Sequence, residues 1–476
     1  MNPLAYVLGA AGLAAFLLLA PKVKALVACI FMTQLFDVGP NLILGYYAWD
    51  YGAAMMLLLA VQVYMMAPRQ RIERHGYLLL VWAMLAWIIV CVLWSLLSYR
   101  YPLLNTIKVS RRMVIGYLLV PIFLRLFAVA PDSFDFLLKW FYRITFVLMP
   151  VVLLQYVLQR KLLNGLFQEY QGSLRAVPIF LPLCLLNAWI ILVRMLSGQK
   201  AAFLELLYLA LALATVALSF TRGIYLAFLL VAGLMAWTMF RDETLKAAAI
   251  SRAALLAVPL LLVLLVTPMG SRVLDRTLNA VQLVGTGGPP KEAADDSFHG
   301  RLGLAGERFR LATERNPLFG FGFIHEDDVP DDLRAGLKYG TVLSGTAADP
   351  LAYARRYATS THYTLGLYSA DIAWADIAIC TGLVGIALLL GLFAALGLHY
   401  SRHRDFVHPS GYAVRLGAFL QLVMLALLML DGDSFFASVH VPAFLLVGLA
   451  LAGPALQVTA AQATVSAPGR PANLMA

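Results

Sequence analysis

Three arginines and one aspartate stand between the apolar segments of this chain. Arg222 lies in the short SFTRG turn, Arg175 in QGSLRAVP, and Arg301 opens RLGLAGERFRLATER. Asp371 stands in SADIAWADIAICTGLVG, where a long apolar run begins. A guanidinium offers paired donors that match phosphate oxygens, and a carboxylate can take a proton from an attacking hydroxyl. These residues predict a site where a hydroxyl attacks and a phosphorylated group leaves. For Arg222 a second interpretation stays open, that its stem lies along lipid while its head reaches water.

The 301–315 segment repeats arginine every seven residues, at Arg301, Arg308 and Arg315. A helix brings residues at this spacing near one edge, so with Arg175 they predict a cationic pocket for a pyrophosphate. Glu307 and Glu314 interleave with them, so an ion-paired surface helix is the alternative.

Asp371 and Asp376 lie at the outer end of the span that begins near Trp374. Asp371 is a candidate general base, and His362, nine residues earlier, is a second candidate for that role. As a helix cap, Asp371 would instead satisfy free backbone amides. Burial would raise the pKa of this carboxyl and nearby arginines would lower it, so both interpretations stay open.

The composition indicates that the elements holding these residues are membrane helices. Of 476 residues, 61% are hydrophobic and 13% charged, whereas a soluble fold has about 25% charged residues. The apolar segments are continuous, which excludes the alternating strands of a β-barrel. The four cysteines lie in separate apolar segments, so neither disulfides nor a cysteine-bound metal is expected. The net charge of +10 suits anionic phospholipids or an anionic substrate, and does not indicate a nucleic acid partner.

We therefore predict an all-α polytopic integral membrane protein with about 12–14 spans. The expected organisation is a transmembrane bundle over 1–269 with about ten spans, a partly helical outer loop over 270–373, further spans over 374–452, and a tail over 453–476. Candidate spans are 3–20, 25–44, 51–67, 77–97, 113–130, 138–158, 177–196, 202–220, 223–240, 253–269, 374–398, 413–430 and 434–452.

The basic loops predict the orientation of the chain. PRQRIERH (68–75), RDETLKAAAISR (241–252) and SRHRDFVHPSGYAVR (401–415) fall on one side, which is therefore cytoplasmic. The 270–373 segment then lies outside. The basic loop 98–112 also falls outside, which means either that a span boundary is wrong or that its charges serve an external anionic ligand.

Three motifs carry a resemblance to a known family. They are LSFTRGIYLAFLL (218–230), GRLGLAGERFRLATERNPLFGFGF (300–323) and ADIAWADIAICTGLVG (370–385). In this order and spacing they resemble the bacterial O-antigen ligase and polymerase superfamily, which includes exopolysaccharide polymerases. The resemblance implies a glycosyltransferase of the helical GT-C type in the inner membrane, with a long periplasmic loop. It also implies that neither a metal nor any other cofactor is used.

The resemblance implies roles for individual residues. Arg222 matches an arginine that holds a lipid-linked pyrophosphate, and Arg301 matches the loop arginine that begins a helix ending in a Gly-x-Gly turn. Asp371 falls where ligases have a histidine and polymerases commonly an aspartate, which favours a polymerase. Ala305 departs from the aromatic residue often found four places after the loop arginine.

The implied function is polymerisation of an O-antigen or exopolysaccharide at the periplasmic face. Donor and acceptor would be glycans linked to undecaprenyl pyrophosphate. Arg222 and Arg301 would stabilise the leaving group, helped by Arg175 or Arg308. A chain-length regulator and a flippase are candidate protein partners. The alternatives are an O-antigen ligase acting on lipid A core, a polysaccharide or lipid-linked sugar transporter, and a non-catalytic scaffold.

Overall fold

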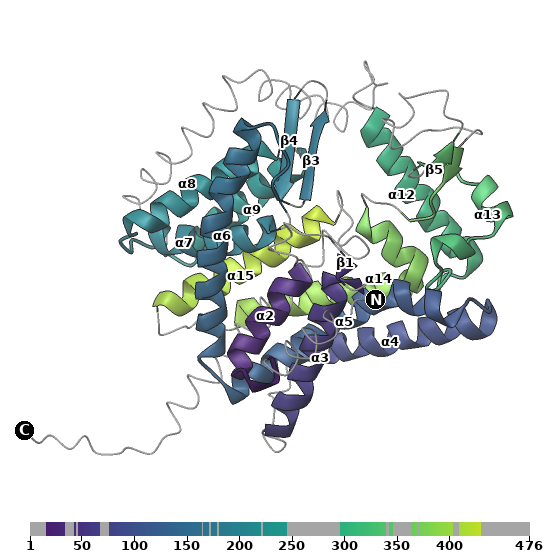
Figure 1. Ribbon diagram of the computed structural model, residues 1–476, viewed down its shortest axis with the longest axis horizontal. Helices are drawn as coiled ribbons and strands as arrows, with labels where there is room; N and C mark the ends of the chain where they lie inside the picture. Colours follow the sequence, from purple (N-terminus) through teal and green to yellow (C-terminus); the bar gives the residue numbers. More distant parts are fainter. Residues whose placement is uncertain are drawn as a thin grey trace, which may run out of the picture.

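The computed structural model is mostly helical, and the described helices form a bundle with a smaller helical lobe beside it (Figure 1). It describes residues 16–33, 42–43, 46–66, 76–163, 165–170, 173–178, 180–219, 222–244, 296–338, 342–345, 363–368, 372–402 and 409–429. The helices are α2 (Pro21–Thr33), α3 (Ala48–Met66), α4 (Gly76–Ser98), α5 (Leu103–Val129), α6 (Ser133–Val157), α7 (Leu181–Leu196), α8 (Phe203–Leu218), α9 (Arg222–Arg241), α12 (Asp296–Arg315), η1 (Glu326–Asp328), α13 (Asp331–Ala335), α14 (Ala373–Arg402) and α15 (Pro409–Leu428).

Among the described residues, six helices are long and apolar enough to cross a membrane: α3, α4, α5, α6, α9 and α14. Three shorter apolar helices, α7, α8 and α15, lie where spans were predicted. Large apolar side chains on α4 and α9, such as Leu79 and Leu229, are more than 60% exposed and suit contact with lipid. The prediction of an all-α polytopic membrane protein is confirmed. The predicted spans 253–269 and 434–452, and most of 3–20, fall outside the described residues.

Within the described ranges, three antiparallel hairpins that the sequence did not predict join some of these helices. They are β1–β2 (Leu42–Ile43 and Tyr46–Tyr47), β3–β4 (Gly165–Tyr170 and Ser173–Pro178), and β5–β6 (Val342–Gly345 and Tyr363–Leu365). In the longest, Gly165 pairs with Pro178, so the hairpin closes directly before α7. The hairpins lie in connecting segments and leave the helical class unchanged.

Helix α15 runs antiparallel to α7 and α9 in the middle of the bundle. At one end the Tyr412 hydroxyl donates to Asp242, just past the end of α9, at 3.2 Å. At the other end the Met429 carbonyl accepts from the Ala373 amide, which begins α14, at 3.0 Å. The C-terminal end of α15 therefore lies beside the start of α14 and on the side of the bundle where α9 begins.

Helix α5 begins ten residues before the predicted span, at Leu103 instead of residue 113. The boundary was therefore wrong, because Lys108, Arg111 and Arg112 of the 98–112 segment lie on the first turns of this helix. Arg111 forms an ion pair with Asp50 of α3 at 2.7 Å and lies over the Trp49 ring. The ion pair and the aromatic ring stabilise the charge of Arg111. A hydropathy pattern takes no account of such contacts, so it places a charged residue outside the span.

Candidate active site

The NPLFGFGF sequence (316–323) forms a tight turn directly after α12. The Asn316 side chain accepts hydrogen bonds from the backbone amides of Leu318 and Phe319, at 3.0 and 3.2 Å. Gly320 and Gly322 then adopt positive φ angles of 63° and 69°. Only glycine takes this conformation at little cost, which explains the Gly-x-Gly spacing. We call residues 316–323 the Gly-x-Gly turn.

The Gly-x-Gly turn exchanges backbone hydrogen bonds with a kink in α14. In a regular helix the Leu383 amide would donate to the Ile379 carbonyl, four residues earlier. Here the Leu383 amide donates to the Pro317 carbonyl at 2.9 Å, and the Ile379 carbonyl accepts from the Phe321 amide at 2.8 Å. Gly382 makes the kink possible with a φ of 62°. The exchange fixes the lobe containing α12 to the first turns of α14.

Helix α4 holds the Gly-x-Gly turn from the other side. The Phe319 ring stacks between Trp87 and Trp94, with centroids 4.9 and 4.6 Å away. The Phe323 amide donates to the buried Ser95 hydroxyl at 2.7 Å, and that hydroxyl donates to the Cys91 carbonyl. The sequence motif predicts only that a helix ends here, and it gives no sign that α4 supports the turn.

Replacing Gly320 by Ala is expected to destabilise the protein by more than ~1 kcal/mol. Alanine at this positive φ is strained, and its Cβ would meet the Ile379 and Ala378 carbonyls of α14. The matched control is Gly306→Ala, inside α12, where a Cβ meets no atom within 4 Å. That change is expected to stabilise by about 0.5–1 kcal/mol. Thermal unfolding in detergent measures the difference in stability between the two variants. Equal melting temperatures would contradict the exchange of backbone hydrogen bonds between the Gly-x-Gly turn and α14.

Three charged side chains of the lobe hold the backbone of residues 365–368. Arg308 donates from Nε to the Leu367 carbonyl at 2.7 Å and from its terminal nitrogen to the Gly366 carbonyl at 3.0 Å. The Glu326 carboxylate accepts from the Leu367 and Tyr368 amides at 3.1 and 2.9 Å. Arg334, which pairs with Glu326 at 3.5 Å, donates weakly to the Leu365 carbonyl at 3.4 Å. We call this arrangement the backbone clamp.

Arg308 is wholly buried, so it does not lie on a solvated helix face, which was the alternative interpretation of this helix. Its guanidinium also pairs with Glu307 at 2.6 Å, and Glu307 accepts from the Lys338 amide at 2.8 Å. Burial lowers the pKa of Arg308, and the carboxylates of Glu307, Asp376 and Glu326 act in the opposite direction. Its contacts are those of a residue that positions the 366–367 backbone.

The backbone clamp lies between the two candidate bases along the chain. His362 directly precedes β6, and Asp371 follows three residues after Tyr368. Both residues lie outside the described part of the chain. The positions that flank Asp371 are nonetheless held, because Tyr368 donates through its hydroxyl to the Ile324 carbonyl at 2.6 Å and Ile372 is buried.

A small apolar cluster brings the neighbours of Arg301 and Asp371 together. Leu304, one turn after Arg301, packs with Ile372 and Ala375 at the start of α14. The structure describes the backbone of Arg301 in the second turn of α12. Residues that neighbour the loop arginine and the candidate base in the sequence therefore lie close together.

A second cluster relates the positions of Arg175 and Arg222. Arg175 lies on β4 opposite Gln168, and Arg222 is the first residue of α9. Val177 of β4 packs against the cluster that contains Ile224 of α9. These chain positions lie at the same end of the bundle.

The C-terminal end of α15 contacts both the start of α14, which follows Asp371, and the cluster beside Arg175 and Arg222. It contacts the start of α14 through the Met429 carbonyl and the Ala426 carbonyl, which accepts from Trp374. Its Leu427 and Leu428 side chains pack against the same cluster as Val177 and Ile224. In Figure 1 this end of α15 lies between the β3–β4 hairpin and α14.

Arg315 lies apart from the other candidate residues. It is fourteen residues after Arg301 on α12, which is about 21 Å along a helix axis at about 1.5 Å per residue. Its guanidinium lies 4.9 Å from the Tyr99 ring and 5.9 Å from the Phe321 ring. Arg315 therefore contacts the turn between α4 and α5, and does not join Arg301 in one pocket.

Two further features of the described residues bear on the site. No group of three or more His, Cys, Asp and Glu side chains there is arranged to hold a metal ion. A cavity of about 460 Å³ lies between α2 and α3, and no candidate residue lines it.

Comparison with known families agrees with the motifs. Residues 207–390 match the Wzy_C family model, described as O-antigen ligase. The matched region extends from α8 through the first half of α14, and includes Arg222, Arg301 and Asp371. No curated protein matches the chain.

Proposed function

We propose a function from one premise, that the chain belongs to the O-antigen ligase and polymerase superfamily, whose members are glycosyltransferase-like membrane enzymes. The proposed activity is that of a polymerase, which joins polysaccharide repeat units linked to undecaprenyl pyrophosphate. The reaction would take place at the periplasmic face of the inner membrane, where the basic loops orient the outer segment.

One observation carries the proposal, the packing of Leu304 against Ile372. It supports a site in which Arg301 and Asp371 act on the same substrate, because their immediate neighbours are in contact. The contacts of the α15 end support adding Arg222, and Arg175 beside it, to that site. Arg308 and Arg315 are proposed to position the lobe. The proposed domain boundaries are those predicted from the sequence.

In the proposed reaction an acceptor sugar hydroxyl attacks the anomeric carbon of the donor glycan. The new glycosidic C–O bond forms as the bond from that carbon to the pyrophosphate oxygen breaks. Asp371 takes the proton of the attacking hydroxyl, with His362 as the alternative base. Arg222 and Arg301 stabilise the charge that accumulates on the departing pyrophosphate. Two arginines can supply this charge, so the proposed reaction uses no metal.

The location of the site fits the physical properties of such a substrate. A polyprenyl chain stays in the bilayer while its sugars stay in water, so the reacting bond lies at headgroup level. The first residues of α9 and α14, and the lobe beside them, are at one end of the bundle. They are the elements that a bond at that depth would meet.

Purified protein supplied with lipid-linked oligosaccharide alone tests the proposal. A polymerase yields a ladder of longer lipid-linked products, whereas a ligase transfers glycan only when lipid A core is added. Movement of intact lipid-linked sugar across vesicles, without new bonds, would identify a transporter. The proposal predicts the ladder, and its absence with folded protein and native substrate would contradict it.

A further inference from the structure

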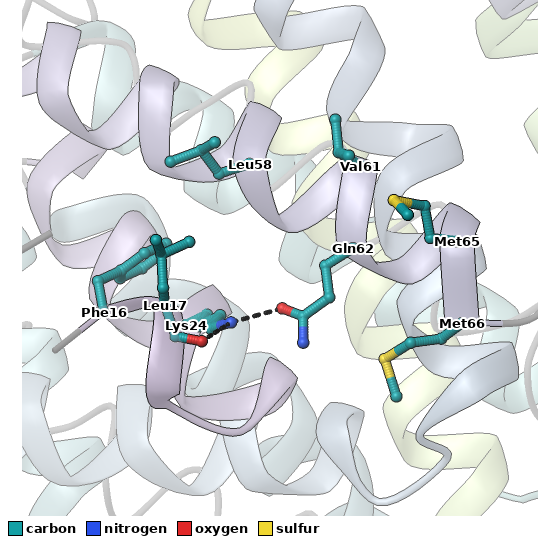
Figure 2. A pocket seen from close by; sticks show the side chains of 8 residues that line it. All are labelled: Phe16, Leu17, Lys24, Leu58, Val61, Gln62, Met65 and Met66. Carbon is teal, nitrogen blue, oxygen red and sulfur yellow. Dashed lines mark hydrogen bonds between the residues drawn. The ribbon is translucent and has the colours of Figure 1, made fainter. Parts of the chain in front are cut away.

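Figure 2 shows the cavity between α2 and α3, and none of the candidate active-site residues lines it. Its volume of about 460 Å³ is in the range of small-molecule sites, roughly 300–1,000 Å³. Its walls include Leu17, Val61 and Met65, which are 53%, 58% and 74% exposed. Val61 and Met65 lie on α3, which is long and apolar enough to span a membrane, so these exposed side chains suit contact with acyl chains.

The cavity lies at one end of the α2–α3 pair. At the other end the two helices touch closely, because a Cβ at Gly52 of α3 would meet backbone atoms of Met32 and Ala28. Towards the end of α3, Lys24 and Gln62 line the cavity. The cavity is therefore built into the geometry of the pair.

Lys24 supplies a buried positive charge at this cavity. It is 3% exposed, and its ammonium donates to the Leu17 carbonyl at 2.7 Å and the Gln62 side-chain oxygen at 2.6 Å (Figure 2). Both acceptors are neutral, and an ammonium has three donors. In the part of the chain that the structure describes, no carboxylate forms an ion pair with Lys24. A buried charge is costly unless it is paired, so the site suits an anionic acceptor.

The neighbouring contacts locate the cavity at the end of the bundle that the basic loops make cytoplasmic. Lys22, two residues before Lys24, pairs with Asp132 in the turn between α5 and α6. The basic PRQRIERH segment (68–75) follows the end of α3 at Met66 almost directly. Loops of this composition face the cytoplasm, where the leaflet carries anionic lipids.

We propose that this cavity binds one anionic phospholipid of the cytoplasmic leaflet. Its phosphate accepts a hydrogen bond from the Lys24 ammonium, and an acyl chain lies along Val61 and Met65. The lipid fills the cavity between α2 and α3. It differs from the polyprenyl substrate, whose pyrophosphate belongs at the opposite end of the bundle.

Native mass spectrometry of the full chain, titrated with phosphatidylglycerol or phosphatidylcholine of the same acyl chains, tests this site. Wild-type protein is expected to bind the first phosphatidylglycerol more tightly than phosphatidylcholine. Lys24→Met is expected to weaken phosphatidylglycerol binding about fivefold, the effect of removing one basic residue from an anionic lipid. The control Lys200→Met removes an exposed lysine from the α7–α8 turn, on the same predicted side, and should leave binding unchanged.

A second variant tests the cavity without touching the charge. Val61→Trp places a large ring in the cavity from an exposed position of α3, and is expected to weaken binding of both lipids. It also keeps the test valid if Lys24→Met fails to fold. Three results would overturn the proposal: equal affinity of the wild type for the two lipids, equal effects of Lys24→Met and Lys200→Met, or unchanged binding in Val61→Trp.

Discussion

Replacing Asp371 by Asn is expected to lower the turnover of glycan polymerisation by about 10²–10⁴-fold, the usual contribution of a general base. Asparagine keeps the shape of the side chain and its capacity to cap a helix, but it cannot take a proton from the acceptor hydroxyl. Binding of the lipid-linked donor should remain, because the arginines proposed to hold the pyrophosphate are unchanged. The measurement is the initial rate of ladder formation at saturating donor, with donor affinity measured separately.

The control for Asp371→Asn is Asp332→Asn, which makes the same chemical change at an exposed position of α13. It should alter turnover by less than about twofold, as surface substitutions usually have small effects. His362→Gln separates the two candidate bases. Full turnover of Asp371→Asn together with a loss in His362→Gln would assign the base to His362. Full turnover of both variants would contradict a base at either position.

Replacing Arg308 by Met is expected to destabilise the protein by about 3–5 kcal/mol, the cost of leaving one partner of a buried ion pair uncompensated. The change removes the donors to the Leu367 and Gly366 carbonyls and leaves the Glu307 carboxylate buried beside an apolar group. Activity should fall as well, since the clamped backbone leads to Asp371. Denaturant unfolding in detergent and the ladder assay measure the two effects.

The double variant Glu307→Gln with Arg308→Met tests the reason for this loss. It removes both charges, so it should be less destabilised than Arg308→Met alone. The matched control is Arg310→Met, whose partner Glu314 lies 3.0 Å away with both side chains more than half exposed. That pair should contribute at most about 1 kcal/mol. A loss in Arg308→Met no greater than that in Arg310→Met would contradict the backbone clamp.

The sequence was sufficient to predict the helical class, because a continuous apolar run as long as α4 or α14 has few stable structures in a membrane other than a helix. It also predicted α12, since the apolar residues of 301–315 recur at helical spacing; the helix begins five residues earlier, at Asp296. The end of α7 and the start of α8 agree with the predicted span ends. Arg194 and Glu205, whose charges mark these ends in the sequence, form an ion pair across the turn between the two helices at 2.6 Å.

Features that depend on distant contacts could not be predicted in the same way. Burial of Arg308 is decided by carbonyl groups almost sixty residues later, which no local pattern reveals. The acidic 325–334 segment contains η1 and the start of α13, and it supplies Glu326 and Arg334 to the backbone clamp. A carboxylate that accepts two backbone amides becomes recognisable only once its neighbours in space are known.

The role of the Gly-x-Gly turn was likewise hidden by its local pattern. Two glycines after Asn-Pro predict a helix end, which is correct for α12. Their exchange of hydrogen bonds with Ile379 and Leu383 requires the kink at Gly382, about sixty residues away. A glycine inside an apolar span was the one available signal, because such a residue often marks a close approach of two backbones.

An experimental structure of the full chain with undecaprenyl pyrophosphate bound, in a lipid nanodisc, tests the central claim most directly. The guanidinium groups of Arg222 and Arg301 are both expected to contact pyrophosphate oxygens, with the Asp371 carboxylate on the side where the sugar is attached. A pyrophosphate held elsewhere on the chain, with these three side chains facing bulk solvent or lying far apart, would contradict it.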